Sequence, residues 1–259
     1  MNSYIKSEFY RILHYKGTYL FILICSAMLV SSNVLLAVVN LSEAGFRYAN
    51  TSFSLGNFIT SVSFIFVLCI AVASMIFGNE HVNHTMKNSI SYGITRGALY
   101  FGKLIVEITY AVVAFIIITV FHVASAYLLL RHSNVNEINE LLRASFVCLP
   151  LLLFALAATN CFVFILESAG TAVAATVGLL IAVPMIGSLL GMKFLFFKRI
   201  SDCLPWNMIN NVGLQNNPYV LILPWKDKLA YYNFWVYGLL QMIIITIVGY
   251  YAFKNKEIK

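Results

Sequence analysis

The sequence predicts an all-α integral membrane protein, and three observations lead to this fold class. Hydrophobic residues make up 61% of the 259 residues and charged residues only 10%, with a mean hydropathy of +0.84. Such a chain has too little polar surface to cover a soluble globule. Its apolar runs are continuous rather than alternating, which favours spanning helices over a β-barrel. We expect a single helical membrane domain, residues 1–259.

Six apolar segments are long enough to cross a hydrocarbon core of about 30 Å, which takes roughly 20 helical residues. The fourth and fifth segments are separated only by residues 167–170, so they are expected to form an antiparallel hairpin in which Gly170 suits a helix end. Six transmembrane helices place both ends of the chain on one side. The expected spans are about 18–39, 58–77, 104–130, 144–166, 171–192 and 234–253.

The segment before the first span, residues 1–17, is expected to lie in the membrane interface. Apolar residues recur at helical spacing from Ile5 to Leu13, whereas Lys6 and Arg11 lie off that face. This pattern is typical of an interfacial amphipathic helix. An ordinary cytoplasmic segment is the alternative.

The long segment before the last span, residues 193–233, contains three prolines and many aromatic residues. Trp and Tyr favour the level of the lipid headgroups. We therefore expect short helices that re-enter the outer leaflet, a surface that an amphipathic substrate leaving sideways would meet. The alternative is an aromatic belt that only anchors the protein.

The orientation rests on the first span. With the chain ends inside, nine Lys and Arg residues lie on the cytoplasmic side and eight on the other, so the positive-inside rule barely discriminates. However, Lys6, Arg11 and Lys16 precede the first span, and only Arg47 lies in the loop after it. Because the first helix usually dominates, both termini are expected in the cytoplasm. The net charge of +7 fits anionic lipids as neighbours, and no pattern points to nucleic acid.

The sequence lacks the residue patterns that are typical of membrane-enzyme active sites. Its only two aspartates both lie in the segment before the last span, which excludes paired intramembrane aspartates. His81 and His84 lack the Glu and the third ligand of a zinc-peptidase helix. Residues 97–104 nearly match a phosphate-binding loop, but Leu104 stands where a Ser or Thr would ligate magnesium. No catalytic residue, metal or cofactor is expected in this chain.

Polar side chains within the spans allow two interpretations. A secondary transporter would need ionisable groups near the middle of the membrane, and His122 is the one deep candidate. The neutral residues Asn33, Asn160 and Gln241 either hydrogen-bond between helices or, together with His122, line a substrate path. A channel or scaffold built on such groups is an alternative.

A polar segment, residues 78–103, reads GNEHVNHTMKNSISYGITRGALYFGK between the second and third spans. It resembles the signature E-x(4)-GT-x(n)-P-x-[ST]-R-x(6)-K of the ABC-2 type permeases. Two departures affect the turn: His84 replaces a Gly, and Tyr92-Gly93 replaces the small or Pro element. The wording NEHxxxTMKNxIxxGxTR is similar to permeases of bacterial antimicrobial-peptide immunity, such as lantibiotic and bacitracin protection. The matching residues are Glu80, Thr85, Lys87, Ser91, Gly93, Thr95, Arg96 and Lys103.

This resemblance implies a fold like that of type V exporters and a role for the polar segment as a cytoplasmic coupling loop. Residues 80–91 would contain a coupling helix that docks on a separate ATP-binding subunit, with Arg96 and Lys103 anchoring the loop against that subunit or lipid phosphates. ATP and magnesium would bind in the partner, so the chain itself is not expected to be an enzyme.

The resemblance also implies the setting. A second permease copy or a paralogue, membrane lipids and the bacterial plasma membrane are the expected surroundings. The expected function is ATP-driven export of an amphipathic substrate, such as an antimicrobial peptide or a lipid-like molecule. A membrane scaffold or sensor, or a stand-alone channel, is the alternative.

Overall fold

The computed structural model describes residues 2–43, 46–61, 64–83, 85–133, 136–166, 168–210, 213–214, 221–222 and 228–256. These residues are almost entirely helical. The helices are α1 (Asn2–His14), α2 (Lys16–Ser42), α3 (Thr51–Thr60), α4 (Phe64–Asn83), α5 (Thr85–Ser91), α6 (Arg96–Leu129), α7 (Asn136–Ile165), α8 (Ala169–Val177), the π-helical segment η2 (Gly178–Ala182), α9 (Val183–Gly191), α10 (Leu195–Asp202), α11 (Pro205–Asn210) and α12 (Lys228–Asn255). Two short strands, β1 (Gly213–Leu214) and β2 (Leu221–Ile222), pair antiparallel.

Five helices in this part of the chain are long and apolar enough to cross a membrane: α2, α6, α7, the continuous helix Gly170–Gly191, and Tyr232–Asn255 within α12. They confirm a multi-pass helical membrane protein. The expected second span is divided, because α3 ends at Thr60 and α4 begins at Phe64. Within the 20 residues of α4, the apolar stretch whose side chains the structure describes is Val67–Phe77. The count of six spans therefore stays a prediction.

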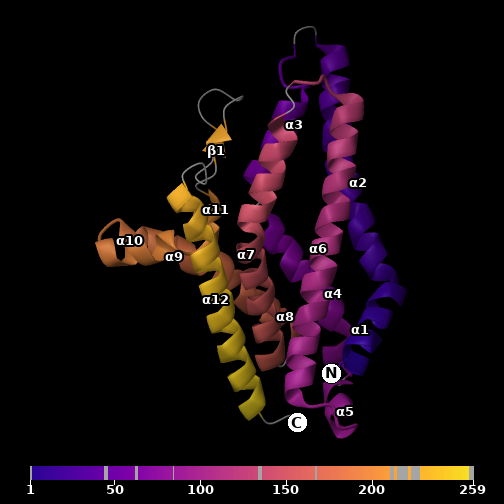
Figure 1. The fold of residues 1–259 in the computed structure, drawn as a ribbon, viewed down its shortest axis with the longest axis vertical. Helices are drawn as coiled ribbons and strands as arrows, with labels where there is room; N and C mark the ends of the chain where they lie inside the picture. Colours follow the sequence, from indigo (N-terminus) through magenta and orange to yellow (C-terminus); the bar gives the residue numbers. More distant parts are fainter. Residues whose placement is uncertain are drawn as a thin grey trace.

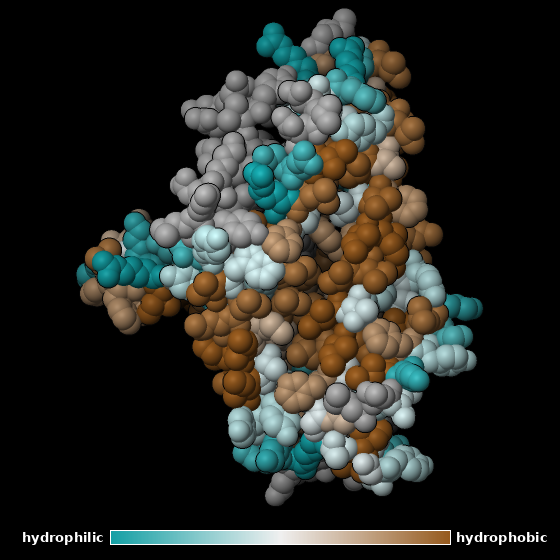
Figure 2. All heavy atoms as spheres, in the orientation of Figure 1, coloured by the Kyte–Doolittle hydropathy of each residue, from teal (hydrophilic) through white to brown (hydrophobic). Residues whose placement is uncertain are grey.

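The long helices run along the length of the molecule, and the start of α1 and the end of α12 lie at the same end, near α5 (Figure 1). Figure 2 shows hydrophobic side chains over the middle of this face, and hydrophilic ones toward its two ends and on the part that projects sideways with α10. The surface thus has the banded distribution that a bilayer requires. The helix α1 lies at the lower end and packs against α6 and α2.

The longest helix, α6, begins at Arg96 rather than at residue 104, where the third span was expected. Its 34 residues extend about 51 Å, well beyond a hydrocarbon core of about 30 Å. Thr95 is its N-cap, and the Thr95 hydroxyl accepts the Ala98 N–H at 3.3 Å. Most of the expected loop 78–103 is therefore helix, made of the end of α4, α5 and the start of α6.

The expected hairpin between the fourth and fifth spans is confirmed. The helix α7 ends at Ile165 and α8 begins at Ala169, with Ser168 as N-cap accepting the Thr171 N–H at 3.1 Å. The two helices pack against each other. Beyond η2 the chain leaves the bundle sideways, and α10 folds back beside α9 (Figure 1). Together α10 and α11 are the short helices expected in residues 193–233.

The core lies around α7, which packs most closely against α12. Gly238 of α12 faces the backbone of α7: a Cβ there would lie 2.7 Å from Pro150 Cβ, 3.0 Å from the Pro150 carbonyl carbon and 3.2 Å from Leu151 N. Backbone atoms within a helix cannot yield as a flexible side chain can. Only glycine allows this approach of the two helices.

We expect Gly238→Ala to lower the free energy of unfolding by about 1–3 kcal/mol, the range for overpacking a well-filled core. Gly170→Ala is the matched control, because a Cβ at Gly170 would meet nothing within 4 Å. Thermal unfolding of both variants in the same detergent measures the difference. Equal midpoints would contradict the close contact between α7 and α12.

Candidate coupling site and membrane cavity

The helix α5 turns into α6 through a glycine at the end of the molecule that carries both termini (Figure 1). Gly93 N–H donates to the Ile90 carbonyl at 3.0 Å, and Ile94 N–H donates to the Ser89 carbonyl at 3.2 Å. These two bonds form a Schellman motif, which requires a left-handed residue at its centre. Gly93 has φ +88°, where any other residue would cost about 1–2 kcal/mol. Gly93 thus shapes the turn between the two helices.

Arg96 connects this turn to the last helix. Its Nη1 donates to the carbonyls of Phe253 at 3.1 Å and Lys256 at 2.9 Å, and also to that of Lys254. The guanidinium carbon lies 5.9 Å from the centroid of the Phe253 ring. Carbonyls at a helix C-terminus lack intrahelical partners and carry partial negative charge, which an Arg compensates. The structure assigns Arg96 this capping contact, and its contact with an ATPase or lipid phosphate stays a prediction.

Lys103 lies inside the protein and is only 1% exposed. Its Nζ is 3.5 Å from Glu8 Oε2 and 4.8 Å from the centroid of the Phe77 ring. The same Glu8 oxygen accepts from Arg11 Nη2 at 2.6 Å, and Arg11 also donates to the Ile76 carbonyl at 3.1 Å. The contact of Lys103 with a docking subunit or a lipid phosphate stays a prediction. In this structure Lys103 joins α6 to α1 through a buried ion pair.

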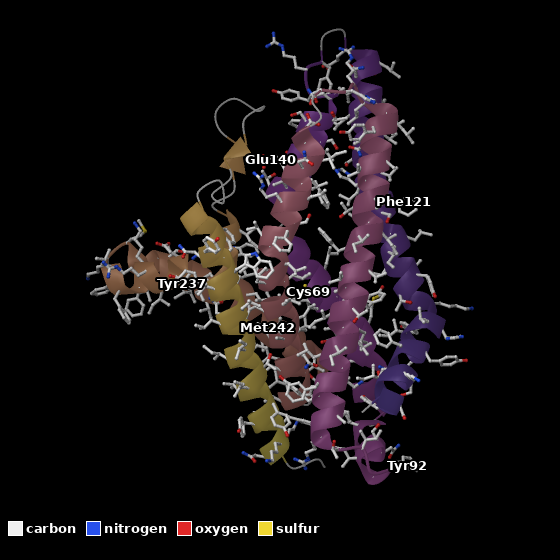
Figure 3. The ribbon with its side chains drawn as sticks, viewed as in Figure 1. Cys69, Tyr92, Phe121, Glu140, Tyr237 and Met242 are labelled. Atoms are coloured by element: carbon white, nitrogen blue, oxygen red, sulfur yellow. The ribbon has the colours of Figure 1, made fainter. Side chains whose placement is uncertain are left out.

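The other predicted coupling residues can be placed along the backbone. Glu80 lies in the last turn of α4, and Thr85 and Lys87 lie in the first turn of α5, but their side chains are outside the described part of the structure. Ser91 ends α5 and is exposed. Tyr92, directly after it, is 88% exposed and projects at the lower end of the molecule (Figure 3). This end therefore presents a short helix and an aromatic side chain to whatever docks there.

Two of the four predicted path residues meet in a buried polar cluster between α2, α3 and α6. Asn33 Nδ2 donates to Ser125 Oγ at 2.7 Å, and Ser54 Oγ donates to Asn33 Oδ1 at 2.5 Å. His122 Nδ1 lies 3.4 Å from Asn33 Nδ2, and His122 Nε2 lies 3.4 Å from Ser54 Oγ. The sequence had not singled out the two serines, which are common in spans as interhelical hydrogen-bonding groups.

These hydrogen bonds favour one tautomer of His122. The single hydroxyl proton of Ser54 goes to Asn33 Oδ1, which can only accept, so Ser54 Oγ accepts from His122 Nε2–H. His122 Nδ1 then accepts from the Asn33 amide. An imidazolium would point a second N–H at that amide NH₂, so the network fits an uncharged ring. With His122 in this form, the cluster is polar and carries no net charge.

Asn160 and Gln241 lie away from this cluster. Asn160 Nδ2 donates to the Tyr100 carbonyl at 3.5 Å, and Tyr100 is about 33 Å from His122 along α6. Gln241 Nε2 donates to the Cys203 carbonyl at 2.7 Å, which ties α12 to the end of α10. Both residues hydrogen-bond between elements, which was one of the two alternatives for the polar residues within the spans. The four residues do not form one continuous path in this structure.

A cavity of about 460 Å³ adjoins the polar cluster. It lies between α2 and α3, with His122 of α6 at its base. Among the residues that the structure describes, no Asp, Glu, Lys or Arg lines it. Its apolar lining is Leu29, Leu35, Leu36, Val39, Phe53 and Phe58, and its polar lining is Ser32, Asn33, Ser54, Asn57, Ser61 and His122.

The fold and the two sites define a multi-pass helical membrane protein with a polar helical turn at one end and an uncharged cavity among its helices. No group of three His, Cys, Asp or Glu residues within the described ranges is arranged to hold a metal ion. The family described as ABC-2 family transporter protein matches residues 4–185, which include the turn and the cavity. The chain belongs to this family, as its resemblance predicted.

Membership identifies the chain as the membrane component of an ABC transporter, a context that implies an ATP-binding partner. A comparison with curated proteins finds no match. The similarity to lantibiotic and bacitracin immunity permeases therefore stays a prediction.

Proposed function

We propose that this chain is the permease subunit of an ATP-driven exporter that moves an amphipathic substrate, such as an antimicrobial peptide or a lipid-like molecule. ATP and magnesium would bind in a separate ATPase subunit. A second permease copy or a paralogue would complete the transport path in a bacterial plasma membrane, with both termini cytoplasmic. Family membership supports the transporter context.

One observation carries the coupling role: the turn around Gly93 is joined to three helices that lead away from it. Thr95 caps α6, Arg96 caps the end of α12, and Lys103 pairs with Glu8 of α1. A displacement of α5 by a docked subunit would therefore move α6, α12 and α1 together. Because α6 extends about 51 Å, its far half carries His122 and the base of the cavity.

The proposal is tested by coexpressing the chain with the ATP-binding subunit encoded nearest to it in its genome. We expect the two to copurify, and the permease to stimulate ATP hydrolysis severalfold in nanodiscs. Tyr92→Glu should weaken copurification, because it places a charge on the exposed turn. Leu41→Glu, at an 86% exposed position near the opposite end of α2, is the control.

Two outcomes would contradict this function. One is the absence of copurification and stimulation with the unaltered chain. The other is ion conduction or a ligand response by the purified chain alone in lipid bilayers, which would favour a channel or sensor.

A further inference from the structure

The cavity between α2 and α3 has an exposed rim and a buried base. Ser32 and Leu35 of α2 are exposed at the rim, whereas Asn33 and His122 at the base are nearly inaccessible. Asn33 lies about 14 Å before the end of α2 at Ser42. The cavity therefore lies within the membrane-spanning part, in the half away from the chain ends, where a molecule dissolved in the bilayer can reach it.

The lining favours a ligand with an alkyl part. Six of the twelve lining residues are Leu, Val or Phe, and they come from both α2 and α3. A volume of about 460 Å³ falls within the roughly 300–1,000 Å³ that is common for small-molecule sites. Burying apolar surface here contributes little beyond what lipid already offers, so selectivity must come from polar groups.

The polar groups of the lining differ in whether they already have hydrogen-bond partners within the protein. Asn33, Ser54 and His122 bond to one another, so they form a pre-organised base rather than free ligand contacts. Asn57 is half-buried, and within the described part of the chain its amide makes no hydrogen bond. A primary amide can both donate and accept, so it suits a hydroxyl, ester or amide group of a ligand.

The charge of the lining limits the ligand further. The described lining holds no ionised side chain, and the hydrogen bonds of His122 fit an uncharged ring. A charged group placed there would be desolvated without a partner, which is strongly unfavourable within a membrane. Ligands with a phosphate or an ammonium group at this depth are therefore disfavoured.

We infer that this cavity binds an uncharged lipid-like amphiphile, with its alkyl chain along the apolar wall and a hydroxyl or carbonyl group on Asn57. The inference rests on the proposed function, because it names the substrate class of the exporter: neutral amphiphiles rather than cationic peptides. Entry from the bilayer past Ser32 follows from the position of the rim.

Photolabelling of the purified full-length chain in nanodiscs tests the site, with diacylglycerol carrying a diazirine in its acyl chain as the probe. Ser32→Trp fills the rim and should lower labelling at least fivefold. Ser31→Trp is the matched control: both serines are exposed, and each hydroxyl donates to the carbonyl three residues earlier, at 2.7 Å. Ser31 does not line the cavity. Equal thermal midpoints of the two variants show that both are folded.

Competition tests the chemistry of the ligand. Unlabelled diacylglycerol should displace the probe at least tenfold better than hexadecane, which has no polar group, or phosphatidic acid, which is anionic. Asn57→Leu should remove most of the advantage over hexadecane. The labelling assay needs no ATPase. A failure of labelling therefore bears on the cavity, whereas a failure of copurification bears on the exporter function.

Three results would overturn the inference. The first is equal labelling of Ser31→Trp and Ser32→Trp. The second is competition by hexadecane or phosphatidic acid as strong as that by diacylglycerol. The third is absence of labelling together with crosslinks between α2 and α3 of two copies, which would show that a second chain covers the cavity.

Discussion

Glu8→Gln is expected to lower the free energy of unfolding by about 3 kcal/mol. The substitution keeps the shape of the side chain but removes the charge that Lys103 and Arg11 share. Removing one partner of a buried ion pair typically costs about 3–5 kcal/mol. Lys103 is 1% exposed, so water cannot replace the lost carboxylate.

Two further variants separate the partners of Glu8. Lys103→Met removes the buried ammonium but leaves Glu8 paired with Arg11, so its cost should be smaller than that of Glu8→Gln. Arg11→Met should cost less than about 1 kcal/mol, because the Arg11 side chain is 38% exposed. Thermal unfolding of the three variants in one detergent gives the order. A larger loss in Arg11→Met than in Glu8→Gln would contradict the buried pair as the stabilising contact.

Arg96→Ala should reduce stimulated ATP hydrolysis about tenfold while the chain still binds its ATPase. The guanidinium donates to three carbonyls at the end of α12, and alanine removes this donor. Within the described part of the chain, the Phe253 carbonyl then keeps only the Lys256 N–H, at 3.3 Å. The end of α12 should then fray, so amide hydrogen exchange at residues 250–256 should rise. Arg96→Lys should recover only part of the activity, because an ammonium cannot reproduce the planar fork of a guanidinium.

The matched control for this contact is Lys254→Ala, which keeps the backbone carbonyl that Arg96 uses. It should leave both hydrolysis and exchange unchanged. If Arg96→Ala loses copurification while exchange at α12 stays as in the unaltered protein, Arg96 contacts the ATPase directly, as the sequence first predicted. Full stimulation in Arg96→Ala would contradict both roles.

Local patterns predicted much of the fold. Continuous apolar runs identified the five helices that are long enough to cross a membrane. The short segment 167–170 identified the hairpin between α7 and α8. The start of α6 was missed because hydropathy decreases around the charged residues Arg96 and Lys103. The capping signal at Thr95 was present and would have placed the start correctly. The division of the second span between α3 and α4 has no strong breaker such as proline to announce it.

The site was harder to predict, because its contacts join residues far apart in the sequence. Glu8 was overlooked, although a lone acidic residue three positions before Arg11 in a basic amphipathic helix was a usable signal. The pairing of Lys103 with α1 and of Arg96 with α12 depends on how the helices pack, which one sequence does not encode locally. Likewise, Asn33 and His122 were singled out separately, but their contact requires α2 to lie beside α6.

The direction of α9 and α10, which leave the bundle sideways, depends on the number of residues in the π-helical segment η2. Val183 N–H bonds to the Gly178 carbonyl five residues earlier, one more than in an α-helix, just before Pro184. Deleting one residue from 178–182 would restore the α-helical register and rotate everything that follows by about 100° around the helix axis. The single extra residue in η2 thus sets the direction in which α9 and α10 leave the bundle. An insertion or deletion there would change this direction without altering any side chain of α9 or α10.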